Sequence, residues 1–132
     1  MRKARFALAA CLLALLTLLC ACGGKSRTVM INQVSNLYYN GVTMEVSVRE
    51  LYIQGNDASA RVRFLNRSDD TMSRVGAVVE FLDKDGGVLY TDELSEVCDY
   101  PIPTGDGVAL TATCSGRNVQ KIASVRVSDL KD

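Results

Sequence analysis

Hydrophobic and polar residues alternate with a period of two along most of the chain beyond residue 28. The clearest run covers 42–49, where Val42, Met44, Val46 and Val48 take every second position between polar residues. Such alternation is typical of an antiparallel strand that buries one face and leaves the other in water. No window of helix length shows a comparable stripe with the helical period. The pattern therefore predicts an all-β domain.

The same pattern predicts further strands, which lie at 29–31, 58–65, 75–81, 88–90, 108–114 and 122–127. Leu51 and Ile53 extend the run at 42–49 with the opposite parity, which indicates a β-bulge near Glu50. A polar segment that holds Cys98 follows the run at 88–90, and the proline-containing segment 100–107 after it is expected to disfavour regular pairing.

Turn-forming residues separate these runs, at Asn40-Gly41, Gln54–Asp57, Asn66–Asp70 and Asp83–Gly87. Short strands with recurrent turns predict an antiparallel β-sandwich of about seven strands. The expected core consists of Val46, Val48, Val62, Phe64, Val79, Phe81 and Val125.

The first 21 residues have the layout of an export signal. Arg2, Lys3 and Arg5 precede a mostly apolar run at 6–19. As a helix this run would span roughly 21 Å, which is short of the ~30 Å hydrocarbon core of a bilayer. A cleaved signal peptide is therefore favoured over a permanent transmembrane helix.

Leu19, Cys20 and Ala21 precede Cys22, and two glycines follow it. This arrangement resembles the lipobox of bacterial lipoproteins, which implies cleavage before Cys22 and acylation of its thiol. Cys20 is the alternative acylation site, but Ala21 suits the position before the cleaved bond better than Leu19 does. An ordinary signal peptide cut nearby and an uncleaved anchor would also fit these residues.

The resemblance implies a signal peptide at 1–21, an acylated cysteine with a short linker at 22–27 and a β domain at 28–132. Several acyl chains would hold the protein firmly on a membrane of the bacterial cell envelope. Inner-membrane lipoproteins often carry Asp after the acylated cysteine, where this chain has Gly23. That difference favours the outer membrane, if the cell has one.

A second resemblance covers Asn66 to Val127. The polar loop at Asn66, the segment 78–89 with its aromatic, Asp and Gly-Gly residues, the turn at 103–107 and the strand at 122–127 resemble FxLYD-type immunoglobulin-like domains of exported bacterial proteins. The resemblance implies an immunoglobulin-like sandwich. The segment 28–57 and the pair Cys98 and Cys114 do not map onto this pattern.

Charge narrows the choice of partners. Without the three basic residues of the leader, 111 residues remain, with 12 basic and 15 acidic side chains and a net charge of −3. This length suits one domain. A mildly acidic chain argues against a nucleic acid or an anionic membrane as partner, because both require clustered Lys and Arg.

Two cysteines, Cys98 and Cys114, remain after the acylation candidates are set aside. Cysteines of exported proteins usually pair, so a structural disulfide between them is expected. A metal pair and a redox couple are the alternatives. Both fit less well, because the chain has no histidine and these cysteines lack CxxC spacing.

Catalytic motifs are missing from the sequence. The absence of histidine excludes Ser-His-Asp and Cys-His centres, and no Gly-rich phosphate loop is present. Asp83–Gly87 lacks the later ligands of a calcium loop and is expected to form a hairpin turn. The acidic residues at 92–99 are expected to be solvated. We therefore expect no catalytic residue, no metal and no cofactor.

Tyr38 and Tyr39, bordered by Asn36 and Asn40, are a candidate binding surface, since tyrosine supplies contact area at low entropic cost. The alternative is that one ring packs in the core and the other covers it. Together these observations predict a lipid-anchored, non-catalytic protein-binding or assembly module with an envelope protein as partner. The alternatives are a structural or accessory subunit of a larger envelope complex and a small-ligand-binding lipoprotein.

Overall fold

The computed structural model describes residues 25–131. The predicted signal peptide and both acylation candidates, Cys20 and Cys22, lie outside this range. Within it, no helix is long and apolar enough to cross a membrane.

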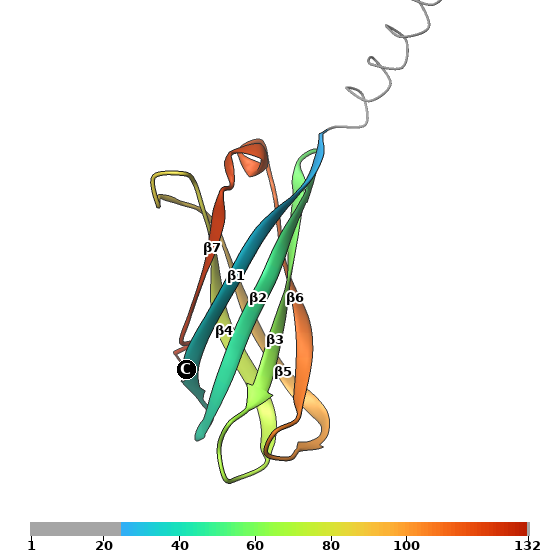
Figure 1. The fold of residues 1–132 in the computed structure, drawn as a ribbon, viewed down its shortest axis with the longest axis vertical. Helices are drawn as coiled ribbons and strands as arrows, with labels where there is room; N and C mark the ends of the chain where they lie inside the picture. The colour runs from blue at the N-terminus through green and yellow to red at the C-terminus, as the bar shows by residue number, and fades with distance from the viewer. Residues whose placement is uncertain (1–24, 132) are drawn as a thin grey trace, which may run out of the picture.

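The described chain forms two antiparallel sheets that pack face to face (Figure 1). The first sheet has the order β1-β2-β3-β6, with bounds Ser26–Tyr39, Val42–Gln54, Asp57–Asn66 and Gly107–Ser115. The second has the order β5-β4-β7, with bounds Val88–Ile102, Met72–Leu82 and Ser124–Ser128. A 3-10 turn, η1 (Val119–Lys121), precedes β7. The predicted antiparallel sandwich of about seven strands is confirmed.

The order of the strands makes the sandwich immunoglobulin-like. The chain crosses between the sheets after β3, β5 and β6, so that β3 pairs with β6 and β4 pairs with β7. Immunoglobulin domains place their B and E strands, and their C and F strands, side by side in the same way. The long β1 adds an edge strand through its hairpin with β2.

The predicted bulge in β2 is confirmed. Val48 pairs with Val62 and Leu51 pairs with Ala60, so Arg49 and Glu50 together face one residue of β3. The extra residue switches which alternate positions of β2 face the core. Val48 and Leu51 are both buried, while the two residues between them are exposed. A regular strand would have turned one of these two side chains inward.

The core lies between the inner faces of the two sheets. All seven predicted core residues are buried, and further large side chains join them, namely Met44, Leu51, Ile53, Met72, Ile102 and Ile122. Alternation predicted the strand residues correctly because each sheet keeps one face in water. Ile122 is buried although it lies in the connection between η1 and β7, two residues before the strand that was predicted to begin with it.

Several strands have other bounds than the predicted runs. The strand predicted at 29–31 extends from Ser26 to Tyr39 and takes in the last two residues of the predicted linker, and the strand predicted at 122–127 begins only at Ser124. The strand predicted at 88–90 runs on to Ile102, through the polar segment and Pro101. Because β5 is an edge strand, one of its sides makes no ladder hydrogen bonds, and an edge tolerates both polar residues and proline.

Asn66 is the buried polar side chain of the described core, with 0% exposure. Its amide nitrogen donates to the carbonyl oxygens of Asp70, at 2.7 Å, and Ile102, at 2.9 Å. Its side-chain oxygen accepts hydrogen bonds from the backbone nitrogen and the hydroxyl of Ser68, at 2.9 and 2.8 Å. Asn66 therefore joins the β3–β4 loop to the end of β5.

Candidate functional site

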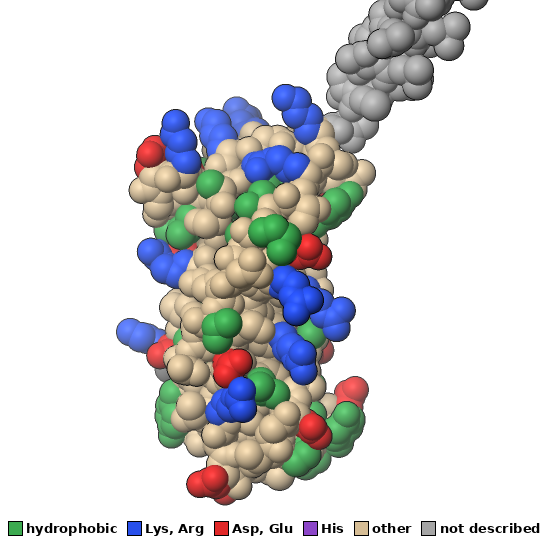
Figure 2. All heavy atoms as spheres, in the orientation of Figure 1, with side chains coloured by type: hydrophobic (Ala, Val, Ile, Leu, Met, Phe, Trp, Pro, Cys, Tyr) green, Lys and Arg blue, Asp and Glu red, His purple; other side chains and the backbone are tan. Residues whose placement is uncertain are grey.

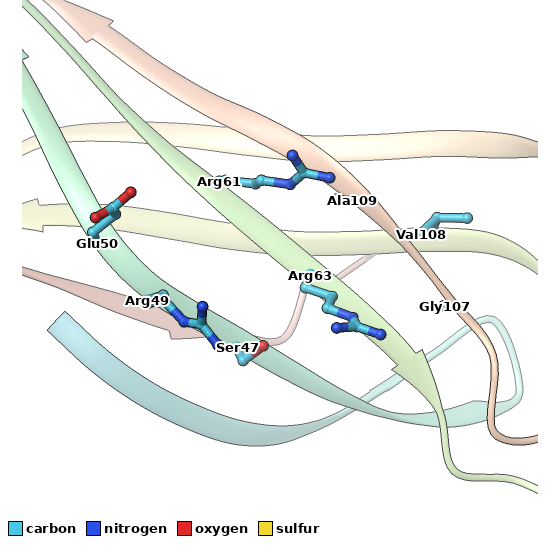
Figure 3. Close-up of a pocket in the computed structure, with 8 residues that line it drawn as sticks. All are labelled: Ser47, Arg49, Glu50, Arg61, Arg63, Gly107, Val108 and Ala109. Carbon is cyan, nitrogen blue, oxygen red and sulfur yellow. The ribbon is translucent and has the colours of Figure 1, made fainter. Parts of the chain in front are cut away.

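Three arginines mark the outer face of the four-stranded sheet as the candidate functional site. Arg49 comes from β2, and Arg61 and Arg63 come from β3 (Figure 3). All three are exposed. Figure 2 shows Lys and Arg side chains gathered over β3 and β6. We call these three residues the arginine cluster.

Strand alternation and the bulge bring the arginine cluster together. On β3, Ala60, Val62 and Phe64 point into the core, which turns Arg61 and Arg63 outward. On β2, the bulge turns Arg49 outward opposite Arg61. The cluster is therefore fixed by two rigid neighbouring strands and needs no loop to position it.

A shallow hollow of about 550 Å³ lies beside the arginine cluster. Its far side is β6, where Gly107 and Ala109 present almost no side chain. Ser47, Arg63 and Ala109 lie opposite one another across β2, β3 and β6. Glycine is required at 107, because a Cβ there would collide with the Phe64 carbonyl oxygen. Because β6 lies close to β3 and presents small side chains at Gly107 and Ala109, the arginine side chains project beyond the neighbouring surface of β6.

The charge of the arginine cluster is not neutralised within the described residues. The ion pairs of residues 25–131 join Arg67 to Glu45, at 3.1 Å, and Arg126 to Glu80, at 3.0 Å, and neither involves an arginine of the cluster. Glu50 lines the same hollow but forms no ion pair with the cluster. Exposed guanidinium groups with a fixed spacing are suited to carboxylate or phosphate groups of a partner.

Large apolar side chains of β1 and β2 share the outer face with the arginine cluster. Met30, Val34, Tyr38 and Tyr52 are between 45% and 63% exposed. Met30 lies opposite Glu50, Val34 opposite Ser47 and Tyr52 opposite Ser59. Tyrosine, methionine and arginine are the residue types enriched in protein interfaces. This face therefore combines charge with exposed apolar area.

The structure separates the two tyrosines that the sequence offered as one binding surface. Tyr38 is 63% exposed on the outer face, whereas Tyr39 is 4% exposed in the core. The Tyr39 hydroxyl lies 3.1 Å from the Ser95 hydroxyl, and its ring packs over Gly76, where a Cβ would collide with it. Of the two, only Tyr38 is accessible to a partner; the Tyr39 ring is buried, as in the alternative interpretation, but Tyr38 lies on the outer face of the sheet.

In the sequence, Arg49, Arg61 and Arg63 stand out only as polar positions of two alternating strands. A signal for their proximity does exist, because the turn at Gly55 and Asn56 joins β2 to β3 and so sets the register between them. The bulge shifts that register by one residue. The grouping therefore depends on the exact position of the bulge, which the parity change locates only approximately.

The predicted disulfide is not formed, and Cys98 and Cys114 are both free. Cys98 lies beside Val108, Ala109 and Leu110 of β6, so Cys114 is at least four residues further along that strand. Four residues span ~13 Å at the usual rise of a strand, and a disulfide requires Cα atoms within ~7 Å.

The surroundings of both thiols suppress their ionisation. Burial raises the pKa of Cys114 to about 11, and the carboxylates of Asp92 and Asp57 add to the shift. Burial, Asp99 and Glu96 also raise the pKa of Cys98. Both side chains are therefore protonated at neutral pH, which makes them poor nucleophiles and poor metal ligands.

Among residues 25–131, no group of three or more Cys, Asp or Glu side chains is arranged to hold a metal ion. Asp83 occupies its predicted hairpin turn, where its Oδ1 accepts hydrogen bonds from the backbone nitrogens of Asp85 and Gly87, at 2.9 and 2.8 Å.

Comparison with known proteins gave no match to a family model, a curated protein or a solved structure.

Proposed function

We propose that this chain is a lipid-anchored, non-catalytic binding module of the bacterial cell envelope that recognises an acidic protein surface through the outer face of its four-stranded sheet. The observation that carries the proposal is the unpaired arginine cluster, which is fixed on two strands and flanked by exposed Met30 and Val34. Acylation at Cys22, an outer-membrane location and kinship with FxLYD-type domains belong to the same proposal.

Several features of the face favour a protein over a small molecule. The hollow lies on an open sheet surface, whereas small-molecule sites are usually concave and largely apolar. Its lining offers arginines, a serine and one glutamate, with no base placed to activate a nucleophile. A rigid sheet with arginine and apolar anchors suits a partner surface that carries carboxylates.

Recovery of the partner from membranes tests the proposal. The tagged chain would be cross-linked in the producing cells, extracted in detergent and purified, and co-purifying proteins would be quantified by mass spectrometry. In the variant R49Q/R61Q/R63Q, we expect the recovered partner to fall roughly tenfold or more, because central arginines often dominate binding energy.

The matched control is R74Q/R126Q/K131Q, which removes the same amount of charge elsewhere on the molecule. It should recover the partner as the unaltered chain does. Equal losses in both variants, or no partner for a correctly folded and anchored chain, would contradict the proposal. A stoichiometric partner that neither variant loses would indicate an accessory subunit held through another surface.

A further inference from the structure

One end of the sandwich carries basic side chains from three different segments. Lys25 immediately precedes β1, Lys84 lies in the β4–β5 hairpin, and Arg117 and Lys121 lie in the β6–β7 connection. Figure 2 shows Lys and Arg side chains at this end, where β1 begins. We call these four residues the basic end.

Backbone contacts hold the segments of this end together. The Gly55 nitrogen donates to the Lys25 carbonyl oxygen at 3.0 Å, and the Gln120 side chain donates to the same oxygen at 3.0 Å. The Ala123 nitrogen donates to the Leu82 carbonyl oxygen at 2.8 Å, which ties the base of the hairpin to the β6–β7 connection. The four basic residues therefore share one rigid end of the fold.

Arg27 reinforces this arrangement without belonging to the basic end. Its guanidinium donates to the carbonyl oxygens of Gln120, at 2.7 Å, and Ile122, at 2.8 Å. It therefore fixes the β6–β7 connection against β1. Because this role is structural, Arg27 is kept unchanged in every variant that tests the basic end.

The charge of the basic end is only partly balanced. None of its four residues forms an ion pair within residues 25–131. Of the nearby acids, Asp83 is held by backbone nitrogens in its turn, and Asp57 accepts a hydrogen bond from the Ser115 hydroxyl at 2.6 Å. Asp85 is the third acid at this end.

The loops at the opposite end of the sandwich carry mainly acidic side chains. Asp69 and Asp70 lie in the β3–β4 loop and Asp106 in the β5–β6 loop, and the one base of these loops, Arg67, is paired with Glu45. The net charge of −3 for residues 22–132 therefore conceals a separation of charge along the sandwich. Net charge alone does not exclude an anionic membrane as the partner of one end of the molecule.

We infer that the basic end contacts the phosphate headgroups of the membrane that anchors the chain, and so holds the sandwich upright with the acidic loops pointing away. Cys22 precedes Lys25 by three residues, which span at most ~11 Å. This distance is close to the Debye length of ~8 Å at physiological ionic strength, so headgroup charge is felt there. The orientation rests on the proposed anchoring, whereas the attraction to anionic lipid does not.

Binding of an unacylated chain to vesicles tests this inference. Residues 22–132 with the substitution Cys22→Ser would be sedimented with vesicles of equal parts phosphatidylglycerol and phosphatidylcholine, and with vesicles of phosphatidylcholine alone. We expect binding to the anionic vesicles only, and weaker binding as salt is added. Each basic residue near an anionic surface strengthens binding about fivefold.

The variant K25Q/K84Q/R117Q/K121Q should lose tenfold or more of this binding. The control R49Q/R61Q/R63Q/R74Q removes the same charge from the sheet faces and should retain it. Circular dichroism checks that both variants are folded. Equal loss in the two variants, equal binding to both kinds of vesicle, or no binding to anionic vesicles would overturn the inference.

The vesicle assay can fail while the proposed protein-binding function holds, and the reverse is also true. The vesicle assay needs neither an acyl chain nor a protein partner, and the partner assay uses a different set of arginines. If the basic-end variant lost the cross-linked partner and the unaltered chain ignored anionic vesicles, a protein would occupy this end, and the inference about lipid would be wrong.

Discussion

At the scale of single residues, Asn66 shows how the sandwich closes its end. A buried amide with no partner would cost ~1–3 kcal/mol, yet all the hydrogen bonds offered by this side chain are made within the β3–β4 loop and to Ile102. Asparagine suits the site because one side chain supplies both donors and an acceptor. The residue therefore determines how the loop folds over the core.

Replacing Asn66 with alanine should destabilise the protein. The substitution leaves the buried Ile102 carbonyl oxygen without its donor and releases the loop, so we expect a loss of about 3 kcal/mol in the free energy of unfolding. Urea denaturation measures it. The control is Asn118→Ala, because Asn118 makes no side-chain cap hydrogen bond and should change stability little. An effect of Asn66→Ala no larger than that of the control would contradict this role.

At the scale of secondary-structure elements, much of the sandwich could be predicted from residue alternation. The run Val42 to Val48 and its parity change at the bulge are visible in the sequence, because each sheet has one buried and one solvated face. The part of β5 beyond Tyr90 was missed, because only Leu94 and Ile102 are buried in it and the remaining side chains show no alternation of buried and solvated positions. Residues 91–97 pair regularly with β4, and the pairing becomes irregular only between Val97 and Ile102.

The candidate site was harder to predict than the strands. Alternation places Arg61 and Arg63 on the solvated face, but only the register between β2 and β3 places Arg49 beside them. Tyr38 was found because it neighbours another tyrosine, and the structure keeps it as part of the exposed face while it buries Tyr39. The disulfide was predicted from compartment alone, without knowledge of where β5 and β6 meet.

The positions of Cys98 on β5 and Cys114 on β6 predict two free thiols of low reactivity. In residues 22–132 with Cys22→Ser, the unfolded but unreduced chain should show two free thiols, those of Cys98 and Cys114, in a colorimetric thiol assay. In the folded chain at about pH 8, Cys114 should react roughly a hundredfold more slowly than a cysteine with the ordinary pKa of 9.0, because its raised pKa of about 11 lowers the thiolate fraction. The thiol reagent with a fully reduced chain serves as the control. Absence of free thiols before reduction would show that a disulfide had formed.

At the scale of the whole molecule, the arginine cluster and the basic end occupy different surfaces of one rigid sandwich. The cluster lies on the outer face of the four-stranded sheet, and the basic end lies where β1 begins (Figures 1 and 2). A sandwich held upright on a membrane would present its arginine face sideways, toward a neighbouring protein on the same surface. The two proposals are therefore compatible within one orientation.

The most direct test of the central claim is site-specific photo-cross-linking in the producing cells. A photoreactive amino acid would replace Ser47, which lies in the hollow beside Arg63, or Thr91, which is exposed on β5 of the other sheet. We predict one discrete adduct from position 47, none from position 91, and loss of the adduct in the variant R49Q/R61Q/R63Q. Adducts of equal yield from both positions, or an adduct from position 47 that survives removal of the three arginines, would contradict the account.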